Sequence, residues 1–502
     1  MLQEPMNQIC QIRRVRPSGS RLARSALFLL PGLFMVNGSC AVNPLTGKRQ
    51  LSLVPESQEI QMGQEGAKQV DATMGVYENA SLNAYVERLG KAIAAKSERP
   101  DLPWSFKVVD DPVVNAFALP GGPIYVTRGL LAHMASEAQL VAVLGHEVGH
   151  VTGRHSVNQM SKATLAQLGL VIGSAVSPTV AGLGQAGMGG LQLLMLRYGR
   201  DAERQADDLG FRYTVSTGYD VREMPGVFAT LKRVGEASGA QAIPSWMSSH
   251  PDPDERVERI NKEIAEKSPP KGKVDRDEFL AITNNLVYGP DPRHGFFEGG
   301  VFKQPEMKFQ FTPPAGWKAQ NMAQAVVAQQ ADGKAALQLT LAKEGGTPAE
   351  AMQKFAATEG VANVVPVTLQ LQVPGSAATF AAKTEGGEIA GLVAFLSHGG
   401  KIFQVMGLAP PASFPSVDPL FRSTLATFAN LTDAAALSAQ PARIKVIAAP
   451  ASMTIAELAA KYPSLPAERL AILNQLNTDS RVPAGQKVKV VEGTVRQEGI
   501  GK

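Results

Sequence analysis

The spacing of hydrophobic and polar positions changes several times along the chain. Near the start, an apolar stretch at 26–36 follows a basic segment. From about residue 136 apolar positions recur at helical spacing, and from about 307 short alternating runs typical of strands take over. The pattern predicts an α+β multidomain protein. We expect a mainly helical domain with a small edge-strand sheet, then an α+β sheet domain, then a small β-α-α-β module.

The clearest helical prediction begins at Ser136. Ser136 followed by Gln139 has the pattern of a capping box, and the apolar run 140–144 continues directly into His146. This helix therefore has a defined beginning and a buried face. A second helix is expected from about Leu191 to Ser216.

The second half of the chain has the alternation of a sheet. Strands are expected at 307–311, 336–341, 367–373, 378–382, 389–395 and 401–406, and helices at 348–358 and 418–431. This α+β domain faintly resembles exported domains of the PsbP/DcrB type. It carries no visible catalytic constellation, so contact with a partner or substrate is the only role that we assign to it.

Length and charge narrow the classes of function. A chain of 502 residues suggests about two to four domains. The formal net charge is +4, and the residues before Cys40 alone contribute five arginines and one acid, which is also +4. The remainder is balanced, so nucleic acid is not indicated as a partner.

The N-terminal segment has the order of a secretory signal: basic residues, the apolar stretch 26–36, and small residues before Cys40. It resembles a bacterial lipoprotein signal, in which the cysteine is lipidated, although Asn37 replaces the usual aliphatic residue. Cleavage elsewhere and an uncleaved anchor are the alternatives. Without Cys10, Cys40 is the only thiol, so no internal disulfide is possible. Ala41 agrees with outer-membrane sorting.

The strongest chemical signal is the H-E-x-x-H motif at 146–150. On a helix, positions i and i+4 share a face, so His146 and His150 can bind one ion while Glu147 reaches its bound water. The alternative is two ordinary histidines on a helix. The motif therefore predicts half of a hydrolytic zinc centre.

A third ligand is expected in the second helix. Glu203 and Asp207 are spaced i, i+4, so one carboxylate can bind the metal while the other orients a ligand histidine. Taken alone, a solvated charged face is the default interpretation of such a pair. Tyr198 and Arg200 lie near them in sequence, but the pattern assigns neither to oxyanion stabilisation.

Three segments together resemble a known family: Asn115 to Val126, the H-E-x-x-H helix, and Arg200-x-x-Glu203-x-x-x-Asp207. They are similar to the BepA/LoiP/HtpX-type zinc metallopeptidases, relatives of the CAAX prenyl endopeptidases. The resemblance covers about residues 40–267. It implies that one zinc ion is bound by His146, His150 and Glu203, with Asp207 in support and Glu147 as general base.

A Pro-Gly-Gly turn at 120–122 precedes a short strand, Pro123 to Thr127. In the family the corresponding strand lies at the edge of a small sheet, where it can pair with an extended peptide. The alternative is a hairpin that merely supports the ligand helix. Between the two helices, the apolar, glycine-rich segment 165–195 could span a membrane by length. Its glycines and Pro178 favour a flap over the site instead.

His250 precedes Asp252 and Pro253, which have the pattern of a helix start. The resemblance implies that His250 can be a fourth zinc ligand that closes the site. The alternative is that His250 only packs or caps. By default, the remaining histidines are interpreted as surface or structural residues: His133, His155, His294 and His398.

The final segment resembles a LysM module, with strands at 443–447 and 487–491 around two helices. Such modules commonly bind N-acetylglucosamine-containing glycans, here peptidoglycan. The first loop, 450–454, departs from the usual Gly-Asp-Thr, and a purely structural tail is the alternative.

Taken together, these features predict an exported zinc metalloendopeptidase in the periplasm, anchored to the outer membrane, whose substrates are misfolded or stalled envelope proteins. Two alternatives stay open: a latent-protease assembly factor for outer-membrane proteins, and a peptidoglycan-associated scaffold with a structural zinc. The expected organisation is a signal segment at 1–39, a zinc metallopeptidase domain at 40–270, a connector at 271–300, an α+β domain at 301–432, a linker at 433–442 and the LysM-like module at 443–493.

Overall fold

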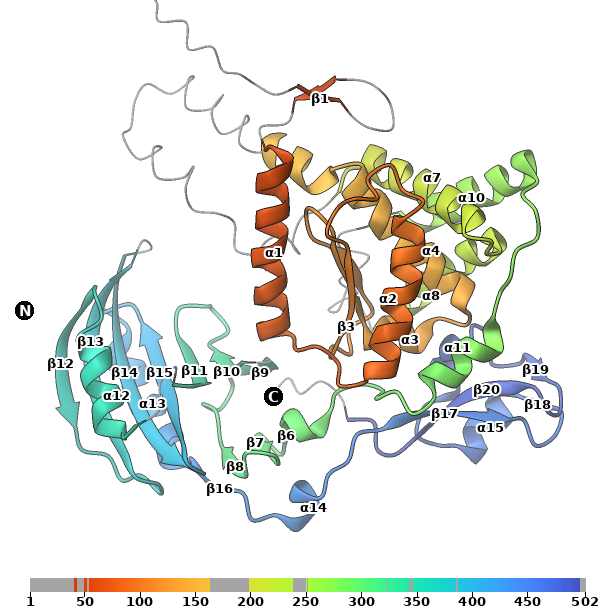
Figure 1. The fold of residues 1–502 in the computed structure, drawn as a ribbon. Coiled ribbons are helices and arrows are strands. Elements are labelled where there is room, and N and C mark those ends of the chain that lie inside the picture. The colour runs from red at the N-terminus through yellow and green to blue at the C-terminus, as the bar shows by residue number, and fades with distance from the viewer. Residues whose placement is uncertain are drawn as a thin grey trace, which may run out of the picture. The chain divides into compact units, whose positions relative to one another are not determined.

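The computed structural model describes residues 40–42, 49–51, 54–162, 198–237, 250, 252–322, 324–342, 346–384 and 387–496 (Figure 1). The leader expected at 1–39 and the whole flap expected at 165–195 lie outside these residues. Near Cys40, strand β1 (Cys40–Val42) pairs antiparallel with β2 (Arg49–Leu51). Within the described residues, no helix has the length and apolar character of a membrane span.

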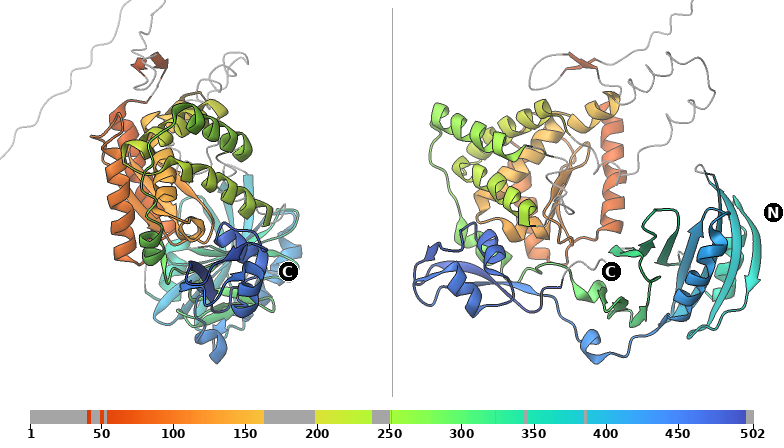
Figure 2. Two further views of the ribbon diagram at one scale, coloured as in Figure 1. Left: turned by 90° about the vertical axis from the view of Figure 1, so that its right-hand side faces the viewer. Right: turned by 180° about the vertical axis from the view of Figure 1, so that it is seen from behind.

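The helical domain is built around α4 (Glu137–Thr152), all of whose residues are buried. On one side lies a three-stranded sheet of β3 (Ser105–Val109), β5 (Pro123–Thr127) and β4 (Ala116–Ala118). On the other side lie α7 (Arg200–Ser216), α8 (Met224–Ala237) and α10 (Pro253–Lys267), as Figure 2 shows from two further directions. The remaining helices of this region are α1 (Glu56–Thr73), α2 (Ala80–Ala94), α3 (Arg128–His133) and α11 (Arg276–Thr283).

Small residues bring α4 and α7 unusually close together. A Cβ atom added at Gly149 would lie 3.0 Å from the Ala206 carbonyl oxygen, and one at Gly210 would lie 3.0 Å from the His146 nitrogen. Close packing of the two helices therefore explains why glycine stands inside the H-E-x-x-H motif. It lets the backbone of α7 approach the helix that carries the two histidines.

The position of β5 differs from the sequence-based expectation. β5 was expected at the sheet edge, but it pairs with β3 in parallel on one side and with β4 antiparallel on the other. The edge strands are β3 and β4, because the chain before the Pro-Gly-Gly turn folds back along β5. The expectation of β5 as an edge strand is therefore wrong, and β4 packs directly on α4.

The expected helix boundaries are largely confirmed. Ser136 caps α4 by accepting a bond from the Gln139 backbone, while the Gln139 side chain accepts from the Ala135 backbone rather than from Ser136 itself. Helix α7 ends at Ser216 as expected, but it begins at Arg200 rather than at about Leu191, because Gly199 before it is extended. Asp252 precedes α10 but makes no side-chain cap.

The sheet domain contains a seven-stranded antiparallel sheet in the order β12-β13-β14-β15-β11-β10-β9. Alternate residues of β14 pack against α13 (Phe414–Ala426) and α12 (Pro348–Ala356), so the two helices cover opposite faces. A second sheet has the order β16-β8-β7-β6. The strands are β6 (Phe296–Glu298), β7 (Val301–Gln304), β8 (Phe309–Phe311), β9 (Lys318–Met322), β10 (Ala325–Gln329), β11 (Ala336–Leu341), β12 (Val361–Val367), β13 (Gly375–Thr384), β14 (Gly387–His398), β15 (Lys401–Ala409) and β16 (Ala429–Asn430).

One strand expectation in this domain is wrong. Residues 367–373 alternate like a strand, but the strand is β12, which ends at Val367. The side chains of Leu369, Leu371 and Val373 still pack against the core. The apolar positions alternate because one face of this segment packs against the core. The segment does not pair with β13, because β12 already occupies that edge of β13.

The terminal segment forms β17 (Arg443–Ala448), β18 (Met453–Thr454), α15 (Ile455–Lys461), α16 (Ala467–Leu473), β19 (Arg481–Val482) and β20 (Lys487–Glu492). Strands β17 and β20 pair antiparallel. The apolar residues of this module join the core of the helical domain. Its polar residues also reach that domain: the Lys489 ammonium group donates to the Ala132 and Met134 carbonyls, and Gln475 donates to the His133 carbonyl.

Candidate metal centre

Helix α4 holds its three polar motif residues deep inside the helical domain. His146, Glu147 and His150 are only 2%, 1% and 1% exposed. Burying such groups is costly unless they are paired or bind a metal. The motif side chains therefore need partners within the fold, and α7 and the segment before α10 supply them.

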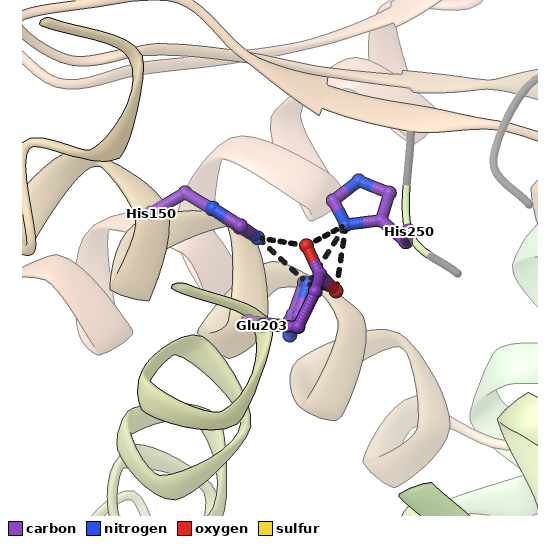
Figure 3. A group of neighbouring side chains, drawn as sticks. His150, Glu203 and His250 are labelled. Carbon is purple, nitrogen blue, oxygen red and sulfur yellow. Dashed lines mark hydrogen bonds and ion pairs between the residues drawn. The ribbon is translucent and has the colours of Figure 1, made fainter. Parts of the chain in front are cut away.

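Four donor atoms from three segments converge, as Figure 3 shows for His150, Glu203 and His250. His146 Nε2 lies 2.9 Å from His150 Nε2 and 3.2 Å from His250 Nδ1. Glu203 Oε1 lies 3.0 Å from His250 Nδ1 and 3.4 Å from His150 Nε2. A tetrahedral zinc ion with bonds of about 2.0–2.1 Å separates its ligands by about 3.4 Å. The residues therefore fit zinc.

The protonation states of these residues also suit a metal. Burial lowers the pKa of His146 to about 4 and holds the pKa of His150 well below its usual value. Burial opposes ionisation of Glu203, but His250 and His150 hold its pKa well below the usual range. Two neutral imidazoles and one carboxylate are the forms in which these residues bind zinc.

Asp207 supports the centre from the next turn of α7. Its Oδ1 lies 2.9 Å from His146 Nδ1, which leaves His146 Nε2 for the metal. Burial alone would raise the pKa of Asp207, but Arg256 holds it far below its usual range. The pair of Glu203 and Asp207 thus lies where the sequence placed it, with both side chains buried.

Arg256 is a site residue that the sequence did not reveal. Its guanidinium group lies over the Phe228 ring at 4.1 Å from the centroid and bonds both Asp207 oxygens. It also lies 3.2 Å from Glu203. Nothing in the charged pattern of α10 distinguishes this arginine from those that face solvent.

Glu147 lies beside the donor set without joining it. Its Oε1 is buried, accepts no hydrogen bond from the described residues, and lies 3.7 Å from His250 Nε2. Burial raises the pKa of Glu147 to about 7, although the nearby charge of His250 opposes the shift. A carboxyl group with this pKa can accept and return a proton near neutral pH.

Other residues near the motif lie in different places. The Arg200 side chain is exposed and pairs with Asp252. Tyr198 stacks on His150 with 4.0 Å between ring centroids, and its hydroxyl contacts the Ser156 hydroxyl. His155 was expected to be structural or on the surface; it is buried and contacts His150. Of Cys40, only the backbone is described.

Residues 80–264 match the family model described as Peptidase family M48. This part of the chain is similar to peptidases of family M48. The match includes all four donor residues and Glu147. Peptidases of this family use zinc, so the M48 assignment and the geometry of the donor atoms point to the same metal.

Curated relatives support the same assignment. The mitochondrial metalloendopeptidase OMA1 of Arabidopsis thaliana is 37% identical over 33% of this chain and 33% of its own length. A putative beta-barrel assembly-enhancing protease of Vibrio cholerae is 31% identical over 42% of this chain and 45% of its own. The beta-barrel assembly-enhancing protease of Escherichia coli is 24% identical over 48% of this chain and 51% of its own. This chain thus spans about half or less of these relatives.

One solved structure is similar to about a quarter of the chain. Cyanobacterial PsbP from Synechocystis is 12% identical, with a TM-score of 0.21 over 26% of this chain and 91% of that chain. A similarity of this size carries no argument, and the role of the sheet domain stays a prediction.

Proposed function

We propose that this protein is an exported zinc metalloendopeptidase whose general base is Glu147. The observation that carries the proposal is the convergence of His146, His150 and Glu203 beside the buried Oε1 of Glu147, which accepts no hydrogen bond from the described residues. The M48 match supports it. The same arrangement supplies metal ligands and a proton acceptor within one buried centre.

The protein residues divide the chemistry of peptide hydrolysis between them. Zinc, when bound, lowers the pKa of a water molecule and polarises the scissile carbonyl. His146, His150 and Glu203 hold the metal, and Asp207 fixes the orientation of His146. Glu147 accepts a proton from the attacking water and delivers it to the leaving amine. A pKa near 7 suits both transfers.

His250 acts as a latch in this proposal. A catalytic zinc site keeps one position for water, whereas a fourth protein ligand closes it. His250 Nδ1 lies 3.2 Å from His146 Nε2 and 3.0 Å from Glu203 Oε1, which is the place of such a ligand. We therefore propose a self-inhibited state, which opens when His250 leaves the metal position.

The four-donor set also favours a second candidate function. A permanently closed site would make the zinc structural, and the protein would then be an assembly factor or a scaffold rather than a protease. Replacing His250 by alanine distinguishes the two. We expect proteolysis to rise if His250 is a latch, whereas unchanged or lost activity would contradict the self-inhibition idea.

For the substrates we propose misfolded or stalled envelope proteins. The support is the name of the bacterial relatives, beta-barrel assembly-enhancing protease. The OMA1 relatives are mitochondrial, so the peptidase domain alone does not determine the compartment. We further propose a periplasmic location with lipidated Cys40 as the membrane anchor and residues 443–493 as a LysM-like module that contacts peptidoglycan.

The decisive experiment is Glu147→Gln in the zinc-loaded mature protein. We expect the zinc content to stay at one ion per chain, while cleavage of unfolded casein falls by about 10²–10⁴-fold, the usual contribution of a general base. Glu468→Gln, an exposed change on α16, serves as the matched control. Undiminished cleavage by the Glu147 variant would exclude this residue as the base.

A further inference from the structure

His155 lies against the second histidine of the motif, on the side away from the other donors. Its Nδ1 is 2.9 Å from His150 Nδ1, and the two rings meet edge to face with 4.9 Å between centroids. His155 is 6% exposed. It follows α4 by only a few residues, so a local turn must bring it back to the helix.

The local conformation of residues 153–154 brings His155 back to α4. After α4 ends at Thr152, Arg154 adopts a left-handed conformation with φ of 54°, which is unfavourable for a residue with a side chain. Arg154 is held there by bonds of 2.9 Å to Glu59 and 2.7 Å to the Val54 carbonyl. A Cβ atom at Gly153 would lie 2.5 Å from His155 Nε2, so glycine leaves the space that the ring occupies.

The far side of the His155 ring is also bonded. His155 Nε2 lies 2.8 Å from Gln205 Oε1, an acceptor on α7 that follows the donor residue Glu203 by two positions. The two bonds therefore connect His150 on α4 to Gln205 on α7 through one imidazole.

We propose that His155 and Gln205 form a proton-ordered relay that positions His150 for zinc. If His150 Nε2 binds a cation, its Nδ1 carries the proton and must donate it. His155 Nδ1 must then accept, which leaves the proton of His155 on Nε2, where Gln205 Oε1 accepts it. Each atom in the relay has one role that agrees with its neighbour. The inference rests on the proposed zinc site.

The relay makes the two histidines of the motif unequal. His146 is supported by the ionised carboxylate of Asp207, whereas His150 is supported by a neutral imidazole that ends on an amide. Outer partners of this kind fix the tautomer and orientation of the ring that binds the metal. His155 is thus a positioning residue, and its loss should be seen first in metal binding.

The test measures zinc affinity of the metal-free full chain by competition with a chromophoric chelator. It also records the visible absorption of the Co²⁺-substituted protein. We expect His155→Ala to weaken zinc binding by about 10–100-fold and to change the Co²⁺ spectrum. Gln205→Met removes only the final acceptor of a half-buried side chain, and we expect a smaller loss. Gln205→Glu, which restores an acceptor, should return the affinity.

His133→Ala is the matched control, because His133 is equally buried but bonds to the Gly129 carbonyl. If His155→Ala fails to fold, Gln205→Met decides. Zinc affinity within about twofold of the parent in a folded Gln205→Met protein overturns the relay, since outer partners normally matter by 10-fold or more. A parent chain that binds no zinc overturns it as well. If the Glu147→Gln variant retains both its zinc and full proteolytic activity, this result contradicts the proposed function but not the relay.

Discussion

The helical domain and the sheet domain bury different kinds of side chain. Among the described residues of the sheet domain, 301–432, the buried polar side chains are Gln304 and Thr424. Its core is a cluster of aromatic and aliphatic residues around Phe309, Phe403 and Phe428. The helical domain buries many charged or histidine side chains: Glu59, Arg99, Arg128, Glu137, His146, Glu147, His150, Glu203, Asp207, His250 and Arg256.

The interiors of the two domains therefore differ in the share of charged and histidine side chains that they bury. Burying a charged side chain costs free energy unless a partner or a metal compensates the charge. Buried charged side chains are therefore expected at positions where they have a role that an apolar side chain cannot fill. In the helical domain the buried charged side chains surround α4. For example, Arg99 pairs with Glu59 and also donates a hydrogen bond to the Val151 carbonyl near the end of α4. The described core of the sheet domain is instead stabilised by the packing of apolar side chains. The following predictions test this contrast.

The largest effect is expected from Glu203→Ala. The change removes the only carboxylate of the four-donor set and leaves His146, His150 and His250. We expect zinc affinity, measured by chelator competition, to fall by more than the roughly 10–100-fold that loss of an outer partner causes. A variant that keeps parental affinity would show that Glu203 is an ordinary buried acid.

The next effect concerns Arg256→Met, which leaves Asp207 and Glu203 with one cation fewer. Breaking a buried pair of this kind costs about 3–5 kcal/mol, and denaturant unfolding measures it. Arg200→Met is the matched control, because its pair with Asp252 is exposed and contributes about 0–1 kcal/mol. Equal losses for both variants would remove the distinction between buried and exposed charge.

A comparable loss of stability is expected from Phe309→Ala in the sheet domain. Removing a buried phenylalanine side chain costs about 3–5 kcal/mol through lost burial and the cavity that remains. Here zinc affinity should stay at the parental value, since the aromatic cluster contains none of the donor residues. A parallel loss of zinc binding would contradict the separation of the two cores.

The smallest effect concerns Lys489, a buried charge of the terminal module. Burial lowers the pKa of Lys489 to about 7, while the unfolded chain keeps an ordinary lysine pKa of about 10.4. Between these values the unfolded state binds more protons, so the free energy of unfolding should rise with pH, by on the order of 1 kcal/mol per unit.

Lys489→Met should abolish this rise between about pH 7 and 10, since methionine does not titrate. Lys487→Met, an exposed change in the same strand, is the control. If the pH dependence of parent and Lys489 variant coincide, the ammonium group is not the source of the slope.

Local signals in the sequence predicted the metal centre better than they predicted its surroundings. The i, i+4 spacing of His146 with His150 and of Glu203 with Asp207 placed these side chains correctly, because both pairs depend only on helix geometry. Arg256 and His155 were missed. Their positions depend on tertiary packing and on the left-handed conformation of Arg154, and neither produces a periodic pattern in the sequence.

The sheets show the same limit. Residues 336–341 were predicted with their observed bounds, because apolar alternation and pairing coincide there. Residues 367–373 alternate as well, but they lie against the core without strand partners. The position of β5 within its sheet depended on where Ala116–Ala118 returned, and spacing along the chain does not contain that information.

The contact between Lys489 and the Ala132 carbonyl joins residues 357 positions apart, directly before the helix that carries the metal ligands. During synthesis, the segment that contains Ala132 therefore emerges long before the Lys489 ammonium group that contacts it. Long-range contacts of this kind form late in folding. A nascent or truncated chain would contain the helix with the two histidines but not the contact from Lys489, so the packing of this protein would be completed only when the last module is present.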